Sequence, residues 1–77
     1  MNRPPMKLQT IIVHKSVAGS REEAHSIAKE YSSEIYSAKE KPGTYHFRVR
    51  APENFVKSSF RSKKVTNGVT LVLGHLK

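Results

Sequence analysis

The fold is decided by residues 20–50, which have the sequence SREEAHSIAKEYSSEIYSAKEKPGTYHFRVR and contain a helix signal followed by a hairpin signal. Ser20 stands three residues before Glu23, the spacing of a capping box, in which each side chain accepts a hydrogen bond from the other residue's backbone amide. The apolar residues that follow recur at intervals of three and four: Ala24, Ile27, Ala28 and Tyr31. This period predicts an amphipathic helix over residues 21–32.

A hairpin follows the predicted helix. We expect its strands at residues 34–38 and 44–50, with the turn at Lys41-Pro42-Gly43, because proline presets φ and glycine permits positive φ. Residue types alternate along the second strand, with Tyr45, Phe47 and Val49 on one face and His46, Arg48 and Arg50 on the other. Such alternation is typical of a strand with one face in the core.

Apolar segments on both sides of this region complete the predicted sheet. Residues 8–14 predict a central strand, because the run of β-branched residues at 11–13 can be buried on both faces. Residues 64–66 and 69–73 predict a second hairpin around Asn67-Gly68, a dipeptide that favours a type I′ turn. The order β-α-β-β-β-β predicts an α+β fold, with one helix packed on a small, mostly antiparallel sheet.

The length of 77 residues indicates a single small domain over residues 1–77, and we expect residues 1–6 to form a flexible leader. The longest apolar run is far shorter than the roughly 20 residues of a membrane-spanning helix. The chain has no cysteine, which excludes disulfides and thiolate metal sites. We therefore expect a cytoplasmic protein that makes no contact with membranes.

The basic charge is concentrated in the second half of the chain. Residues 1–40 contain six Lys or Arg and five Glu, whereas residues 41–77 contain eight Lys or Arg and one acid, Glu53. The net charges of the halves, +1 and +7, add up to the +8 of the whole chain. A compact region this basic repels itself, and binding to a polyanion commonly offsets such repulsion.

The second half therefore contains the candidate binding residues. On the predicted strand, side chains two residues apart project together at steps of roughly 6–7 Å, similar to the phosphate repeat of an extended nucleic acid. Arginine can also bridge phosphate oxygens and stack on bases. We expect phosphate contacts from Arg48, Arg50, Arg61, Lys63 and Lys64, with Lys57 and His46 at the margin. Arg61, Lys63 and Lys64 can extend this patch from the following loop if the two basic segments are neighbours, a point that the sequence leaves open, and Arg3 and Lys7 can add to it.

Other functions stay open at this point. The same cations are also explained by a solvated sheet face, by docking to an acidic protein partner, or by a structural place in a larger particle. If residues 69–73 form an exposed edge, they offer a site for a homodimer or for strand addition by a partner. Tyr36 is the one aromatic residue outside the core pattern and therefore a candidate for stacking.

We expect no enzymatic activity, cofactor or metal site. The chain contains no glycine-rich phosphate loop and no nucleophile elbow. None of its four histidines is followed three or four residues later by another histidine or an acid, so a metal site would require convergence through folding alone. The predicted function is therefore a small basic protein that binds nucleic acid without strong sequence specificity. The alternative is an accessory protein that modulates an acidic partner.

A resemblance covers the last 33 residues. The patterns Phe47-Arg48-Val49-Arg50, Pro52-x-x-Phe55, Ser59-Phe60-Arg61 and Gly68-Val69 with Gly74-x-Leu76-Lys77 resemble a short module of small basic proteins encoded by phages and prophages. The resemblance implies a phage or mobile-element origin, and such proteins often bind nucleic acid or a host protein. It includes no catalytic signature and assigns no residue a role.

Overall fold

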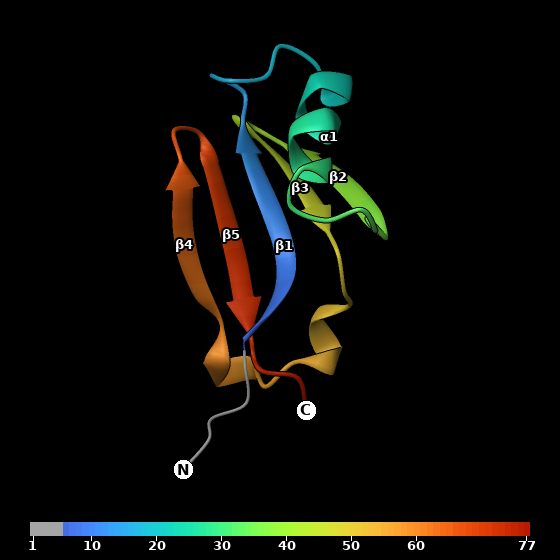
Figure 1. Ribbon diagram of the computed structural model, residues 1–77, viewed down its shortest axis with the longest axis vertical. Helices are drawn as coiled ribbons and strands as arrows, with labels where there is room; N and C mark the ends of the chain where they lie inside the picture. The colour runs from blue at the N-terminus through green and yellow to red at the C-terminus, as the bar shows by residue number, and fades with distance from the viewer. Residues whose placement is uncertain (1–5) are drawn as a thin grey trace.

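The computed structural model describes residues 6–77, which fold into one helix and a five-stranded antiparallel sheet (Figure 1). This confirms the predicted α+β class. Residues 1–5, which include Arg3 and most of the expected leader, lie outside the described residues. Along the chain the elements are β1 (Lys7–His14), α1 (Arg21–Lys29), β2 (Ser37–Lys41), β3 (Thr44–Arg48), the 3₁₀ turns η1 (Pro52–Asn54) and η2 (Lys57–Ser59), β4 (Arg61–Thr66) and β5 (Val69–Gly74).

The sheet has the strand order β2-β3-β1-β5-β4, so β1 is the central strand and β2 and β4 form the edges. Ile11 of β1 lies opposite Phe47 of β3 and Leu71 of β5. Ile11 and Val13 are completely buried in the core on one face of the sheet, while Ile12, on the opposite face, stays half-buried. The segment 69–73, considered above as a possible exposed edge, is an interior strand because β4 pairs with its outer side.

The helix begins where its cap predicts. The Ser20 side chain accepts a hydrogen bond from the Glu23 backbone amide at 3.2 Å, but the Glu23 carboxylate accepts from the Gly19 amide and not from that of Ser20. Ala24 and Ala28 are buried together with Ile11 and Phe47, so α1 packs on β1 and β3. Figure 1 shows that β4 and β5 stand clear of the helix. The helix ends at Lys29, three residues before the predicted end.

The strand bounds differ from the prediction on both sides of the first turn. Lys41 pairs with Thr44, which places Pro42 and Gly43 in a two-residue turn and moves the first strand from residues 34–38 to 37–41. The second strand ends at Arg48, because the amides of Val49 and Arg50 both donate to the carbonyl of Gln9 at a β-bulge in β1.

The second hairpin also differs in detail. Its first strand begins at Arg61, not Lys64, so residues expected in a loop belong to β4. Gly68 has a φ of 80°, whereas Asn67 does not have a positive φ. The turn is therefore not type I′, which needs positive φ at both positions. The bulge between Lys64 and Thr66 adjusts the strand to this turn.

A second apolar cluster lies at the Gly74 end of the sheet. Phe55 is 1% exposed, and its ring centroid lies 5.5 Å from that of Phe60. Phe55 also forms a β-bridge with Leu76, and the Val56 amide donates to the carbonyl of His75. The segment that follows β3 is thus fixed against the end of the chain beyond β5. Within residues 6–77, no helix has the length and apolar character needed to cross a membrane.

Candidate nucleic-acid interface

The sheet has one face against α1 and one face on which residues 6–77 place no α-helix, which we call the open face. Side chains that lie directly opposite each other on paired strands point to the same face. The register of the four strand pairs therefore shows on which face of the sheet each side chain lies. Ile11, Val13 and Phe47 point toward the helix. The open face consists of Lys7, Thr10, Ile12 and His14 of β1, Ser37, Lys39 and Lys41 of β2, Thr44, His46 and Arg48 of β3, Ser62 and Lys64 of β4, and Thr70, Val72 and Gly74 of β5.

This face is basic and has no opposing charge of its own. Among the strand positions that the structure describes on it, none is Asp or Glu. The single strand carboxylate, Glu40, points to the helix side of β2, where its Oε2 lies 2.6 Å from the Lys15 ammonium. This ion pair raises the pKa of Lys15 and lowers the pKa of Glu40, mainly through their shared hydrogen bond. An anion that approaches the open face therefore meets no repelling strand carboxylate.

The cations gather on the β2–β3 half of the open face, in a group that we call the β2–β3 cluster: Lys39, Lys41, Arg48, His46 and His14. His46 lies at its centre, opposite Lys39 on one side and Ile12 on the other. Its Nε2 lies 3.0 Å from the Thr44 hydroxyl. Partial burial lowers the pKa of His46, and the nearby charges of Lys41, Arg48, His14 and Lys39 lower it further. The His46 ring thus lies in a positive electrostatic field from residues of β1, β2 and β3.

The structure places only part of the predicted set in this cluster. Arg48 and His46 belong to it, and Arg48 is exposed. Lys64 also lies on the open face, but on the opposite edge strand. The row Lys39–His46–Ile12–Thr70–Lys64 crosses all five strands, so its ends are about 19 Å apart at a strand spacing of about 4.8 Å.

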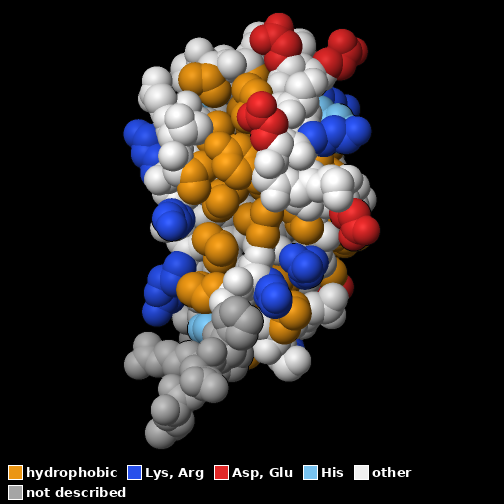
Figure 2. Space-filling view, in the orientation of Figure 1, with side chains coloured by type: hydrophobic (Ala, Val, Ile, Leu, Met, Phe, Trp, Pro, Cys, Tyr) orange, Lys and Arg blue, Asp and Glu red, His pale blue; other side chains and the backbone are white. Residues whose placement is uncertain are grey.

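Arg61 and Lys63 point to the other face of the sheet. They pair with Leu73 and Leu71, whose side chains lie on the helix side of β5. The two basic segments therefore do not form one continuous patch, because residues of β4 alternate between the two faces. Figure 2 shows this helix-side face, with hydrophobic side chains exposed beside the helix and Lys or Arg side chains along the β4 margin.

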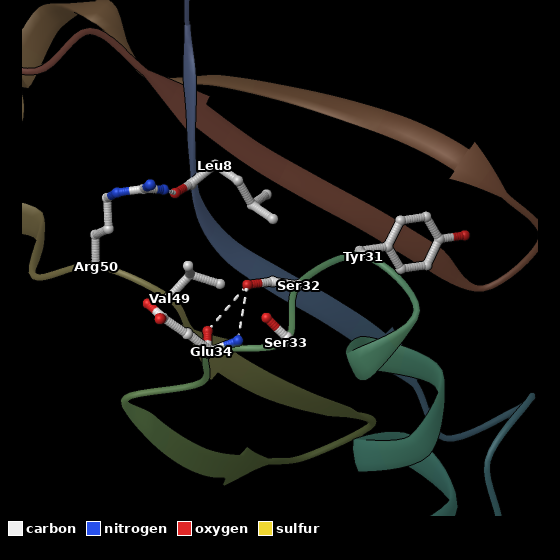
Figure 3. Close-up of a pocket in the computed structure, with 7 residues that line it drawn as sticks. All are labelled: Leu8, Tyr31, Ser32, Ser33, Glu34, Val49 and Arg50. Atoms are coloured by element: carbon white, nitrogen blue, oxygen red, sulfur yellow. Dashed lines mark hydrogen bonds between the residues drawn. The ribbon is translucent and has the colours of Figure 1, made fainter.

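Arg50 also leaves the predicted face, since it lies beyond the end of β3. Its guanidinium Nη1 donates to the Leu8 carbonyl at 2.9 Å. It lines a cavity of about 300 Å³ with residues that follow the helix, Tyr31 to Glu34 (Figure 3). Inside this cavity the Ser32 hydroxyl is hydrogen-bonded to the backbone of Glu34, so part of its polar lining is already satisfied.

Lys57 lies in η2, away from the β2–β3 cluster. It lines a second cavity, of about 470 Å³, together with Pro52, Glu53, Phe55, Phe60 and Lys77. Tyr36, the predicted stacking candidate, is 60% exposed, and its amide donates to the Arg48 carbonyl at 2.8 Å. This exposed ring precedes β2 and belongs neither to the β2–β3 cluster nor to the cavity that Lys57 lines.

Sequence reasoning missed Lys39, Lys41 and His14. The signal for the two lysines was present in the alternation of residues 37–41, SAKEK, once the strand is counted back from a two-residue Pro42-Gly43 turn. His14 joins the cluster because β1 pairs with β3, and no local sequence pattern predicts that pairing.

In the part of the chain that the structure describes, no group of three His, Asp or Glu side chains is placed to hold a metal ion. The comparisons with known proteins add no relatives: no family model, curated protein or solved structure matches the chain. The arrangement of the open face is therefore the main guide to function.

Proposed function

We propose that the protein binds the phosphate backbone of nucleic acid through the open face of its sheet, without strong sequence specificity. The observation that supports this most is the β2–β3 cluster, where exposed cations from two strands surround a histidine with no strand carboxylate among them. Strand and residue spacings of about 4.8 and 6–7 Å put these cations within reach of successive phosphates. Because the described part of the chain places no recognition helix on this face, backbone contacts dominate, and they carry no sequence information directly.

Salt dependence follows from the number of cations. If Lys39, Lys41 and Arg48 each neutralise one phosphate, the logarithm of the binding constant falls with the logarithm of salt concentration at a slope of about −3 for duplex DNA and about −2 for a single strand. A bound phosphate also favours the protonated form of His46. Binding is therefore expected to strengthen as the pH falls through the titration of His46.

The test is fluorescence anisotropy with labelled single- and double-stranded oligonucleotides over a range of salt concentrations. The double variant Lys39→Ala/Arg48→Ala should bind at least about tenfold more weakly, with the duplex slope reduced by about 2. The matched control, Arg61→Ala/Lys63→Ala, removes the same charge from the helix-side face and should keep most of the affinity. Equal losses in the two variants, or no binding by the wild type at low salt, would overturn the proposal.

A second function is favoured by the helix-side face. Half-buried Val65 and Leu71 pack on the core beside the helix, and Arg61 and Lys63 lie along the same side of β4. An apolar strip with a cationic margin fits an acidic protein partner, such as the host protein expected for a phage or mobile-element accessory protein. Such a partner would survive nuclease treatment in a pull-down and would be lost with Arg61→Ala/Lys63→Ala, the reverse of the ranking expected for nucleic acid.

A further inference from the structure

We propose that the cavity walled by Phe55 and Phe60 accepts an unstacked base of a single-stranded nucleic acid whose backbone lies on the open face. This inference rests on the proposed function and adds the class of ligand. The cavity has a volume of about 470 Å³, within the range of small-ligand pockets, and its exposed lining is mainly apolar. Phe55 forms a rigid floor of the cavity, because its side chain is buried and only 1% exposed. Phe60 is only partly buried, so part of its ring surface stays accessible.

The aromatic wall of the cavity adjoins the open face. Gly74 continues the open-face column of Thr70 and Val72, so a side chain at this position would project from that face. A Cβ atom built on Gly74 would lie 3.0 Å from Cδ2 of Phe55 and 3.1 Å from Cδ1 of Phe60. The two aromatic rings therefore lie against the Gly74 end of the open face, and the missing side chain makes room for them.

Cations connect this end with the β2–β3 cluster. Arg48 shares a cross-strand row with Thr10 and Val72, two residues before Gly74, which places Arg48 about 12 Å from Gly74 by strand geometry. Lys7 pairs directly with Gly74 on the open face. A backbone that follows Arg48 and Lys7 reaches the aromatic cavity within about two nucleotides of an extended strand.

The chemistry of the cavity fits a base better than a phosphate. Sequence-independent single-strand binding combines cations that follow the backbone with aromatic rings that stack on bases. Lys57 and Lys77 line the cavity and outnumber its one acid, Glu53. The neighbouring Val56 and Leu76 are 40% and 41% exposed, so the surface around Lys57 and Lys77 is partly apolar. Bases stacked within a duplex cannot reach such a cavity, which makes the single strand the expected ligand.

The test separates bases from phosphates. Two labelled single strands of about ten nucleotides, oligo(dT) and an abasic oligomer with the same number of phosphates, are titrated against each protein. The wild type should bind oligo(dT) at least about fivefold more tightly than the abasic strand, as expected for one stacked base. Phe60→Leu keeps an apolar side chain but removes the ring, so it should bring this ratio close to one while the salt slope stays unchanged.

Tyr36→Leu provides the control, because it removes an exposed ring outside the cavity and should preserve the wild-type ratio. Urea unfolding verifies that both variants are folded. A wild-type ratio near one with a steep salt slope would overturn the base site, leave the phosphate-binding function in place, and favour an apolar protein side chain as the occupant. A ratio unchanged by Phe60→Leu, or lost with Tyr36→Leu, would also overturn it. Absence of binding to either strand would instead reject the proposed function.

Discussion

The pKa of His46 reflects the burial and the positive charge of the open face around it. Its ring is partly buried and hydrogen-bonded to Thr44, and positive groups face it from β1, β2 and its own strand. Burial is the first reason why its pKa is lowered, and the field of its neighbours is the second. The residue therefore stays neutral in the folded protein at pH values where an unfolded histidine takes up a proton.

The pH dependence of stability follows from this difference. As the pH falls below about 6.5, the unfolded chain protonates at position 46 before the folded chain does, so the free energy of unfolding decreases until the pH passes below the folded pKa. His46→Gln removes this contribution. Urea unfolding between about pH 7.5 and pH 5 should show a shallower loss of stability in the variant than in the wild type. Parallel curves would mean that His46 does not carry the lowered pKa.

Arg50 is a residue whose position cannot be predicted from the alternation of residue types along the strand. Its spacing from Arg48 and His46 is correct for a shared strand face, but β3 ends before it, because a bulge at Gln9 draws the amides of Val49 and Arg50 to one carbonyl. The bulge lies in the pairing of β1 with β5, between the pair Leu8 and Leu73 and the pair Thr10 and Val72, so it depends on segments far apart in the sequence. Alternation alone cannot reveal it, since the local pattern continues past the end of the strand.

At the scale of elements, the two hairpins use glycine for the same conformation in different surroundings. Gly43 and Gly68 have φ values of 82° and 80°. A Cβ atom at Gly43 would meet nothing within 4 Å, whereas at Gly68 it would lie 2.6 Å from both Cγ atoms of Val17. The β4–β5 turn is therefore packed against Val17 in the connection between β1 and α1. The β2–β3 turn touches the same connection only through its backbone, where the Gly43 carbonyl accepts from the Lys15 amide at 3.0 Å, and the side-chain position at Gly43 stays open.

Alanine substitutions separate these two requirements. Gly43→Ala should cost about 1 kcal/mol, the strain of a side chain in the left-handed region. Gly68→Ala should cost about 2–3 kcal/mol, because overpacking against Val17 adds to the same strain. Urea unfolding measures both, and Val17→Ala in the Gly68→Ala background should recover part of the additional loss. Equal costs for the two glycines would contradict the packing of the β4–β5 turn.

The sequence predicted the elements better than their registers. The capping serine and the helical period identified α1, and the two glycine turns identified both hairpins. The three-residue shift of β2 arose because Lys41 was placed in the turn, although it pairs with Thr44. Because one residue of shift moves a side chain to the other face, such errors decide which cations share a surface. This is why the candidate site was predicted less well than the fold class.

For the molecule as a whole, the net charge of +8 is large for 77 residues. Two salt bridges link the described residues, and both involve Glu40, so the open face contributes repulsion without internal compensation. Self-repulsion of this kind destabilises the compact state and is reduced by salt. The isolated protein should therefore be least stable in dilute buffer.

Thermal unfolding in NaCl tests this balance. Raising the salt concentration from about 0.01 M to about 0.1 M shortens the Debye length from about 30 Å to about 10 Å. The melting temperature should rise by about 4–8 °C if screening contributes about 1 kcal/mol. The triple variant Lys39→Gln/Lys41→Gln/Arg48→Gln should melt higher in dilute buffer and respond less to salt. A melting temperature of the wild type that is independent of salt would show that the repulsion is already compensated.

The central position of β1 also has a consequence for how the chain reaches its native state. The strand is the first to be synthesised, yet one of its neighbours, β5, is the last. Its contacts are therefore non-local, and closing such long loops slows folding. Before β5 is synthesised, α1 and the β2–β3 hairpin can form from adjacent segments, but the central strand with Ile11 and Val13 lacks one of its two neighbours until β5 is complete. The sheet should thus form in one cooperative step, after β5 has left the ribosome.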